Sequence, residues 1–414
     1  MTPREPARHR FRAGRAPNSL RISGLRGSVS APAAETAGAK GGAPTPHYLG
    51  LDALRFFAAL LVVVYHFGFW HWTRGQTLAP QIIGSNPLPH FQPDFGWVGV
   101  EIFFVVSGFV ISMSAQGASP RQFAFGRILR LAPGAWVCAT LTLAILLALL
   151  DRSLASVWPD YLGSMVFWPF RAIDGVYWTL GIEVSFYVLV YLIMRRGALA
   201  QLEAIAAVIG LGSVAFWICA LPMEAALRPM SGLGGELHTL VAKAEGNRLL
   251  QLLLVQHGVF FAVGVILQNV ARGERLIPRA PLLVVLGVGC ALEIIGENTI
   301  IERAADMELS PIPALVTFAA AMTALATSIR WNAAISATWR AKNGALARLG
   351  RMTYPLYLTH NPLIFGTCAL AAPFLGGWSE LLGLVVAIGG AALIEWGPER
   401  VVRRRLSAHL LRWA

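Results

Sequence analysis

The run LDALRFFAALLVVVYHFGFW at residues 51–70 decides the fold class of this chain. Its only ionisable side chains near neutral pH are Asp52, Arg55 and His66, and nearly all of its other residues are apolar. The length matches the roughly 20 residues that an α-helix needs to cross about 30 Å of hydrocarbon. Because the backbone finds no water in that layer, the run must be helical. We therefore predict a transmembrane helix here.

Similar apolar runs recur along the rest of the chain. The composition agrees, because 56% of the 414 residues are hydrophobic and only 14% are charged, which is unusual for soluble domains. We expect an all-α integral membrane protein that crosses the lipid bilayer as a bundle of ten transmembrane helices. Beyond the first span, the runs lie at about 97–115, 132–150, 176–194, 199–221, 249–270, 281–297, 311–329, 352–372 and 379–397.

The basic residues indicate how these spans are oriented. With a cytoplasmic amino terminus, about 26 of the 34 Lys and Arg residues fall on the inner side, as the positive-inside rule requires. The loops then assigned to the outer side hold several acids instead, among them Glu297, Glu302, Asp306 and Glu308. An even number of spans then predicts that both termini are cytoplasmic.

The ends of the chain differ from its middle. Residues 1–46 are rich in Arg, Ala, Gly, Ser and Pro, which predicts a disordered basic arm; an organellar transit peptide or an over-long start would look similar. We expect residues 47–400 to form the transmembrane domain and 401–414 a basic cytoplasmic tail. The net charge of +12 is dispersed between apolar runs, so we expect no nucleic-acid partner. Four cysteines lie in apolar runs without a CxxC pair, so we expect no metal site.

Ionisable side chains inside spans are the candidates for a functional site, because they are costly there. Arg55 and His66 are eleven residues apart, which returns to within about 20° of the same helix face, about 16 Å further along the axis. Taken alone, this pair also fits an interfacial Arg anchor and a His bonded within the bundle. No partner can be named for three further candidates, His257, Glu293 and Glu395. The full set is Asp52, Arg55, His66, Glu101, Glu183, His257, Glu293, His360 and Glu395.

Five segments resemble motifs of the membrane acyltransferase 3 family, in order and spacing. They are LDALRFFAALLVVVYH at 51–66, GWVGVEIFFVVSGFVIS at 96–112, RILRLAPGAW at 127–136, WTLGIEVSFY at 178–187 and YPLYLTH at 354–360. The resemblance covers about residues 47–400. It implies an O-acyltransferase that modifies cell-envelope carbohydrates or small secreted metabolites. It also implies that Arg55 and His66 are functional residues, and we expect a bacterial inner-membrane protein.

Topology and chemistry suggest a role for His66. In the predicted orientation His66 lies in the outer half of the first span, and Glu183 in the fourth span lies at a similar depth. Neutral imidazole suits the removal of a proton from a hydroxyl acceptor, and a carboxylate can orient such a ring. We therefore predict His66 as the general base with Glu183 behind it. An acyl-His66 intermediate stays open, and so does a packing role for Glu183 bonded to Tyr187.

The cytoplasmic side offers a place for the donor. Arg127 and Arg130 lie one turn apart at the predicted inner end of the third span, where guanidinium groups suit the phosphates of acyl-coenzyme A. The positive-inside rule alone would also explain them. Arg55 lies between this mouth and His66. We expect Tyr354, Tyr357 and His360 to line the substrate cavity, although a hydrogen-bonding role in the core fits His360 nearly as well.

These observations predict transfer of an acyl group, with acetyl as the first choice, from cytoplasmic acyl-coenzyme A to an extracytoplasmic hydroxyl. The acceptor would be a carbohydrate, a lipid-linked sugar or an envelope metabolite. The main alternative is a proton-coupled secondary transporter or acyl-group exporter, since buried His and carboxylate residues also form proton relays. A non-catalytic scaffold or sensor would use the same residues only for helix packing.

Overall fold

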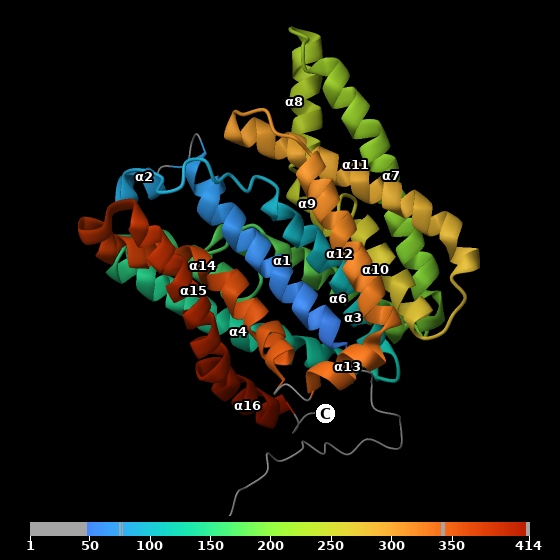
Figure 1. Ribbon diagram of the computed structural model, residues 1–414. Coiled ribbons are helices and arrows are strands. Elements are labelled where there is room, and N and C mark those ends of the chain that lie inside the picture. Colours follow the sequence, from blue (N-terminus) through green and yellow to red (C-terminus); the bar gives the residue numbers. More distant parts are fainter. Residues whose placement is uncertain (1–47, 74–75, 77, 341–343, 411–414) are drawn as a thin grey trace, which may run out of the picture. The chain divides into compact units, whose positions relative to one another are not determined.

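The computed structural model describes residues 48–73, 76, 78–340 and 344–410. The chain divides into two units, Met1–Thr45 and Pro46–Ala414, and all described residues belong to the second. Within them every regular element is helical (Figure 1), which confirms the predicted all-α class. The predicted arm at 1–46 and residues 411–414 of the predicted tail lie outside the described residues.

The longer helices follow the apolar runs of the sequence. Those at the predicted spans are α1 (Leu49–Gly68), α3 (Gly99–Ala115), α4 (Pro120–Ala148), α6 (Trp178–Arg195), α7 (Leu202–Leu227), α10 (Gly258–Ala271), α11 (Ala280–Ala305), α12 (Ile312–Arg330), α14 (Ala345–Leu375) and α15 (Ser379–Trp396). The shorter helices are α2 (Leu78–Ile83), α5 (Leu154–Met165), α8 (Leu233–Glu245), α9 (Arg248–Leu252), α13 (Asn332–Arg340) and α16 (Pro398–Leu410).

Eight helical stretches in the described residues are long and apolar enough to cross a membrane. The predicted number was ten, and two features account for the difference. Predicted span 249–270 is divided, because the helix breaks after α9 and α10 has only 14 residues. Predicted spans 352–372 and 379–397 belong to one continuous apolar stretch, Ala345–Leu410. The structure therefore establishes a polytopic helical membrane protein with eight candidate crossings.

Helix α1 lies inside the bundle and packs against α3, α12 and α14 (Figure 1). Its small residues Ala58 and Ala59 are fully buried, as is Val63, so neighbouring helices approach it on several sides. Helix α14 in turn packs against α15 and α4. This arrangement brings the polar residues of α1 next to those of α14, which are almost 300 positions later in the chain.

Helices α3 and α10 approach each other closely at two glycines. A Cβ added to Gly264 would lie 2.1 Å from the Val105 carbonyl oxygen, and one added to Gly108 would lie 2.3 Å from the Phe261 carbonyl oxygen. Real side chains never come that near, so only glycine fits at either position. Gly108 lies in the segment at 96–112, and its small size allows α3 to pack closely against α10.

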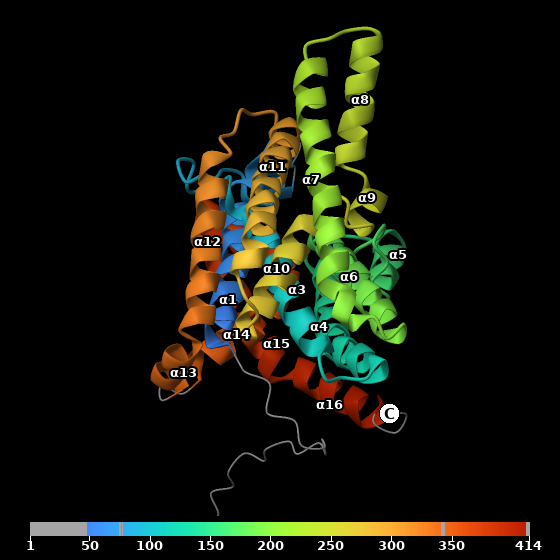
Figure 2. The same ribbon diagram turned by 90° about the vertical axis from the view of Figure 1, so that its right-hand side faces the viewer.

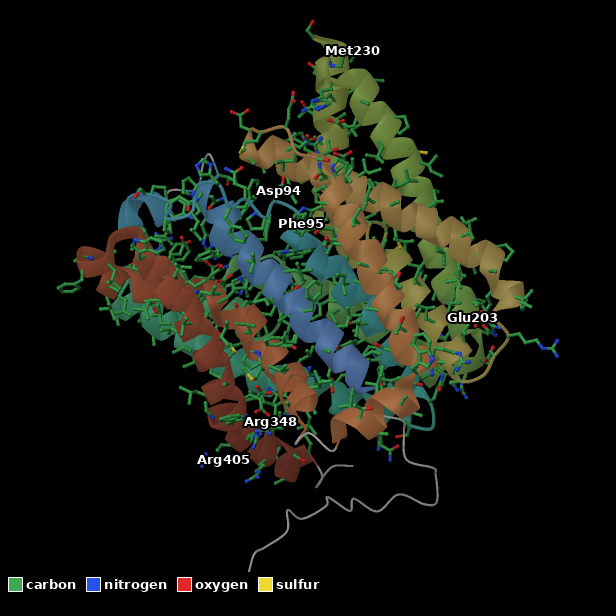
Figure 3. All side chains as sticks on the ribbon, in the orientation of Figure 1. Asp94, Phe95, Glu203, Met230, Arg348 and Arg405 are labelled. Atoms are coloured by element: carbon green, nitrogen blue, oxygen red, sulfur yellow. The ribbon has the colours of Figure 1, made fainter. Side chains whose placement is uncertain are left out.

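The stretch between the predicted spans at 199–221 and 249–270 forms a helical hairpin. Helix α7 continues to Leu227, and α8 returns alongside it (Figure 2). Met230 lies at the tip of this hairpin, and Arg348 and Arg405 lie at the opposite end of the bundle (Figure 3). Arg303 of α11 bonds Glu224 of α7 at 3.2 Å and Glu245 of α8 at 2.5 Å. These ion pairs hold the base of the hairpin to the bundle.

Candidate functional site

A cavity of about 550 Å³ opens where α1 ends. Its wall includes His66 from the last turn of α1, His71 from the following turn (Trp70–Trp72), Asp174 from the segment before α6, and Tyr357 and Asn361 from α14. These residues are far apart in the sequence, and the packing of α1 against α14 brings those of the two helices together. The cavity is large enough for a sugar unit or a similar small ligand.

The hydrogen bonds around His66 fix its tautomer. His360 Nδ1 lies 2.9 Å from the Tyr357 carbonyl oxygen and 3.2 Å from that of Leu356, so in the neutral ring this nitrogen carries the proton. The other nitrogen, Nε2, is then an acceptor, and it faces His66 Nδ1 at 3.3 Å. His66 Nδ1 also faces the Val62 carbonyl oxygen at 2.9 Å.

With two acceptors before it, His66 Nδ1 must be the protonated nitrogen of the neutral ring. The lone pair of His66 therefore lies on Nε2, and the residue is half-buried in the cavity wall. A neutral imidazole in a cavity wall, with its lone pair on a nitrogen that no bond to the backbone occupies among the described residues, is the arrangement that a general base needs. His360 is fully buried and does not line the cavity, so it lies behind His66, in the position where Glu183 was expected.

A second histidine, His71, belongs to the same cavity. Its Nε2 donates to Asn361 Oδ1 at 3.1 Å, and Asn361 Nδ2 donates to Asp174 Oδ1 at 3.2 Å. The Val176 amide also donates to Asp174. Burial raises the pKa of the Asp174 carboxyl, and the bonds from Val176 and Asn361 oppose that rise. Sequence reasoning missed His71 and Asp174, because neither lies within an apolar run.

Deeper in the bundle, Glu183 belongs to another polar group. It accepts hydrogen bonds from Ser107 Oγ at 3.0 Å and from the Tyr187 hydroxyl, and it lies within electrostatic reach of Arg55. The described residues show no bond between Glu183 and His66. The expected pairing of these two residues is therefore wrong, and the bond to Tyr187 that the sequence left as the alternative is present.

The two polar groups meet at Tyr357. A space of only about 50 Å³ lies between Arg55, Ser107, Glu183, Tyr354 and Tyr357. Tyr357 lines both this space and the cavity of about 550 Å³ beside His66, which is called the outer cavity. Its hydroxyl bonds Thr179 at 3.0 Å. The sequence therefore correctly placed Tyr357 and Tyr354 at a cavity wall, whereas the binding roles of these residues stay predictions.

The polar group of Arg55, Ser107, Glu183 and Tyr187 is called the inner group. The residues predicted to bind the acyl donor lie beside it. The Arg127 guanidinium lies 5.8 Å from the ring centre of Tyr187, and that of Arg130 lies 5.8 Å from the ring centre of Tyr354. Tyr354 in turn donates to the Leu131 carbonyl oxygen at 3.2 Å. Cation–π contacts of this kind hold guanidinium groups near aromatic faces. A series of charged and aromatic side chains thus connects Arg127 and Arg130 to Glu183 and Arg55.

Comparison with known proteins identifies the type of domain. A family model for an acyltransferase domain matches residues 48–396, which is nearly all of the described chain. No solved structure matches.

A curated relative, YrhL of Bacillus subtilis (strain 168), is 30% identical over 188 residues. Its name describes a peptidoglycan O-acetyltransferase and marks that assignment as unproven. The aligned stretch covers 39% of this chain and 26% of the relative, so this chain spans only part of YrhL.

Proposed function

Since this chain belongs to a family of acyltransferase domains, we propose that it is a membrane O-acyltransferase that takes its acyl group from cytoplasmic acyl-coenzyme A. The acceptor is a hydroxyl group of a carbohydrate or envelope metabolite on the opposite side of the membrane. The observation that supports this most strongly is that His66 lines the outer cavity and that the two acceptors at its Nδ1 leave its lone pair on Nε2.

In the proposed reaction, the acceptor hydroxyl lies in the outer cavity and gives its proton to His66 Nε2. The hydroxyl oxygen forms a bond to the thioester carbonyl carbon, and the bond between that carbon and sulfur breaks. The coenzyme A thiolate leaves and takes the proton from the His66 imidazolium. Proton and electron pair therefore balance without any further reactant. Attack by His66 Nε2 itself, followed by transfer from an acyl-His66, would use the same geometry.

His360 is proposed as a positioning residue. Its Nε2 accepts from His66 Nδ1, so it keeps the lone pair of His66 on Nε2. When His66 gains a proton, the same bond becomes charge-assisted and stronger. The ring thus resembles the orienting member of a catalytic triad in its role, although it is neutral.

The inner group is proposed to handle the donor. Arg127, Arg130 and Arg55 provide positive charge from the basic end of the helices up to the small space below Tyr357. Phosphate groups of coenzyme A suit Arg127 and Arg130, and Arg55 suits the carbonyl oxygen as it gains negative charge. A space of about 50 Å³ fits a thin, extended arm better than a sugar, so donor and acceptor would meet near Tyr357.

The acceptor to test first is peptidoglycan, because the name of YrhL describes that substrate. Acetyl is the first donor group to test for the same reason. A lipid-linked sugar or another envelope carbohydrate has the same hydroxyl chemistry and provides the second set of acceptors.

We also propose ten crossings with both termini in the cytoplasm of a bacterial inner membrane. The break between α9 and α10 is enclosed by protein, since Leu254, Gln256 and His257 are buried, and non-helical backbone is tolerated at membrane depth where protein rather than lipid surrounds it. Fluorescent-protein and alkaline-phosphatase fusions at the carboxyl terminus test the orientation. Fluorescence without phosphatase activity supports a cytoplasmic terminus, and the reverse pattern contradicts it.

The catalytic proposal is tested with purified protein in lipid nanodiscs. Acetyl-coenzyme A and peptidoglycan fragments are added, the release of free thiol is followed, and acetylated product is identified by mass spectrometry. Wild type, His66→Ala and His90→Ala are compared. His90 is an exposed histidine in the loop before α3, so its variant controls for the loss of a histidine elsewhere.

We expect acceptor-dependent thiol release by wild type and His90→Ala, and none above background by His66→Ala. Release that continues at the wild-type rate in His66→Ala contradicts the role of His66. Release by none of the proteins, with several donors and acceptors, would favour the transporter alternative instead.

A further inference from the structure

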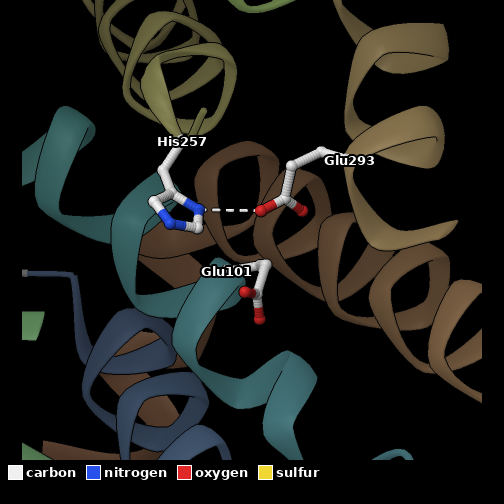
Figure 4. Close-up of side chains that lie close together, drawn as sticks. All are labelled: Glu101, His257 and Glu293. Carbon is white, nitrogen blue, oxygen red and sulfur yellow. Dashed lines mark hydrogen bonds and ion pairs between the residues drawn. The ribbon is translucent and has the colours of Figure 1, made fainter. Parts of the chain in front are cut away.

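A second histidine-containing cluster lies apart from His66, between α3, α10 and α11. It consists of Glu101 in the first turn of α3, His257 just before α10 and Glu293 in α11 (Figure 4). One potential ligand atom from each residue lies within 4.8 Å of the other two. His257 Nδ1 and Glu293 Oε1 are 2.7 Å apart. Three separate helices thus direct donor atoms toward one point.

These donor atoms are buried and incompletely bonded. Glu101 is 2% exposed, and both His257 and Glu293 are 0% exposed. Within the described residues, Glu101 Oε2, His257 Nε2 and Glu293 Oε2 have no hydrogen-bond partner. Burying a polar atom without a partner costs about 1–3 kcal/mol, and an uncompensated charge costs more. Unpaired carboxylate oxygens on both Glu101 and Glu293 in one cluster call for an additional partner.

The local charges indicate what that partner is. Glu297 follows Glu293 by one helical turn and adds another carboxylate to the field of the cluster. Arg248 is a positive group within electrostatic reach of both His257 and Glu297, and Arg303 also acts on Glu297. The Arg248 guanidinium lies 5.0 Å from the ring centre of Trp178 and bonds Gln251 at 2.5 Å, and no ion pair joins it to the cluster within the described residues. Carboxylates therefore outnumber cations here.

We propose that Glu101, His257 and Glu293 form a binding site for a divalent transition-metal ion such as Zn²⁺ or Mn²⁺. The ion's charge of +2 matches the two carboxylates, which lets both stay ionised in a buried place. One imidazole nitrogen with carboxylate oxygens suits these ions, whereas Ca²⁺ and Mg²⁺ prefer oxygen ligands alone. Binding requires the short bond between His257 and Glu293 to open around the ion.

The cluster borders the outer cavity. Glu101 and Glu297 both line that cavity, so an ion would reach the cluster from the same side as the acceptor. Once bound, it would connect the start of α10 to α3 and α11, two helices that line the cavity. This site is independent of the proposed acyl transfer, and it departs from the expectation of no metal, which rested on the cysteines alone.

Metal binding to the full-length protein in detergent tests the proposal directly. The protein is treated with a chelator, equilibrated separately with Zn²⁺ or Mn²⁺, desalted and analysed for metal content. The variants are His257→Gln and Glu293→Gln. The control is His238→Gln, which removes a His–Glu contact of 3.3 Å in the hairpin of α7 and α8 and leaves the cluster intact.

We expect about one metal ion per wild-type or His238→Gln chain, and less than about a tenth of that in the two cluster variants, as for a single site built from few ligands. A wild-type protein that retains neither ion overturns the proposal. So do cluster variants that bind as much as wild type.

A second measurement needs no variant and so does not depend on how variants fold. The thermal unfolding of chelator-treated wild type is compared before and after addition of Zn²⁺ or Mn²⁺, with Mg²⁺ as the control ion. An ion that binds the folded state stabilises it increasingly as its free concentration exceeds its Kd. We expect a higher Tm with Zn²⁺ or Mn²⁺ than with Mg²⁺, and equal values for the three ions contradict the site. Neither measurement uses acyl transfer, so failure here leaves the proposed function untouched.

Discussion

The outer group around His66 and the inner group around Glu183 have similar kinds of residue but opposite surroundings. The outer group borders a cavity of about 550 Å³, whereas the inner group encloses about 50 Å³. His66 lines the outer cavity with its lone pair on Nε2, whereas the Glu183 carboxylate already accepts two hydroxyl bonds. A basic nitrogen in the wall of a large cavity suits catalysis, while a carboxylate that is already bonded in a narrow space suits positioning. The experiments below test this division.

The largest effect is expected for His66→Gln. The amide can still donate to the Val62 carbonyl oxygen, but it cannot take up a proton. We expect the rate of acyl transfer to fall by at least about a hundredfold, as when a general base is removed. The Tm should stay close to that of wild type. Thiol release and thermal unfolding measure the two quantities, and a variant that keeps most of its activity would assign the base elsewhere.

Arg55→Gln should have the next largest effect, and it should act on the donor. A hydrogen bond to a charged group is worth about 1.5–3 kcal/mol, so we expect kcat/KM for acetyl-coenzyme A to fall by at least about tenfold. The KM for the acceptor should not change, because Arg55 lines the inner space and not the outer cavity. Initial rates with each substrate varied in turn measure this. A change in the acceptor KM alone would contradict the division.

His360 is expected to act through His66. Groups that orient a working histidine are typically worth about 10- to 100-fold, so His360→Leu should lower kcat by about tenfold. His360→Gln should restore part of that loss, because its amide oxygen can still accept from His66 Nδ1. A purely structural role would instead lower the Tm of both variants without such rescue. Kinetics and thermal unfolding of the two variants distinguish these results.

Glu183→Gln should have a smaller effect. The amide oxygen can still accept the bonds from Ser107 and Tyr187, and only the charge near Arg55 is lost. We expect less than about a tenfold fall in rate, below the roughly 10²- to 10⁴-fold effect of a catalytic acid or base. A loss as large as that of His66→Gln would instead indicate that the Glu183 carboxylate takes a direct part in the reaction.

The smallest effect concerns pH and Asp174. Burial raises the pKa of this carboxyl above its ordinary value, so the folded state binds more protons than the unfolded state in the pH window between those values. Stability due to this group therefore falls as pH rises through that window. Asp174→Asn lacks the carboxyl, so we expect its Tm relative to wild type to rise by about 1–2 °C over the same window. Thermal unfolding of both proteins at several pH values measures the difference, and a constant offset would contradict it.

Much of the fold could be predicted because lipid imposes a simple rule on sequence. Runs such as 51–70 and 311–329 must be helical, and both coincide with helices, α1 and α12. The break between α9 and α10 could not be predicted, since hydropathy does not report where a helix is interrupted inside an apolar region. Helix α8 was not predicted, because its sequence is too polar for a transmembrane span. It is also too short to indicate that this stretch folds back as a helical hairpin.

The site was predictable only along single helices. The shared face of Arg55 and His66 follows from helix geometry alone, and so does the contact between Glu183 and Tyr187, four residues apart. Contacts between helices do not follow from such spacing. The partners of His66 and of Glu293 are 294 and 36 positions away, and only the packing of α1 on α14 and of α10 beside α11 brings them together.

Asn361 has a consequence for where protons can travel. It joins His71 to Asp174 by two hydrogen bonds, yet its amide neither gains nor loses a proton near neutral pH. It therefore interrupts proton transfer along the hydrogen bonds that run from His71, in the cavity wall, to the Asp174 carboxylate. That route would therefore not carry away a proton taken up by His66, which suits the proposed return of the proton to the leaving thiolate.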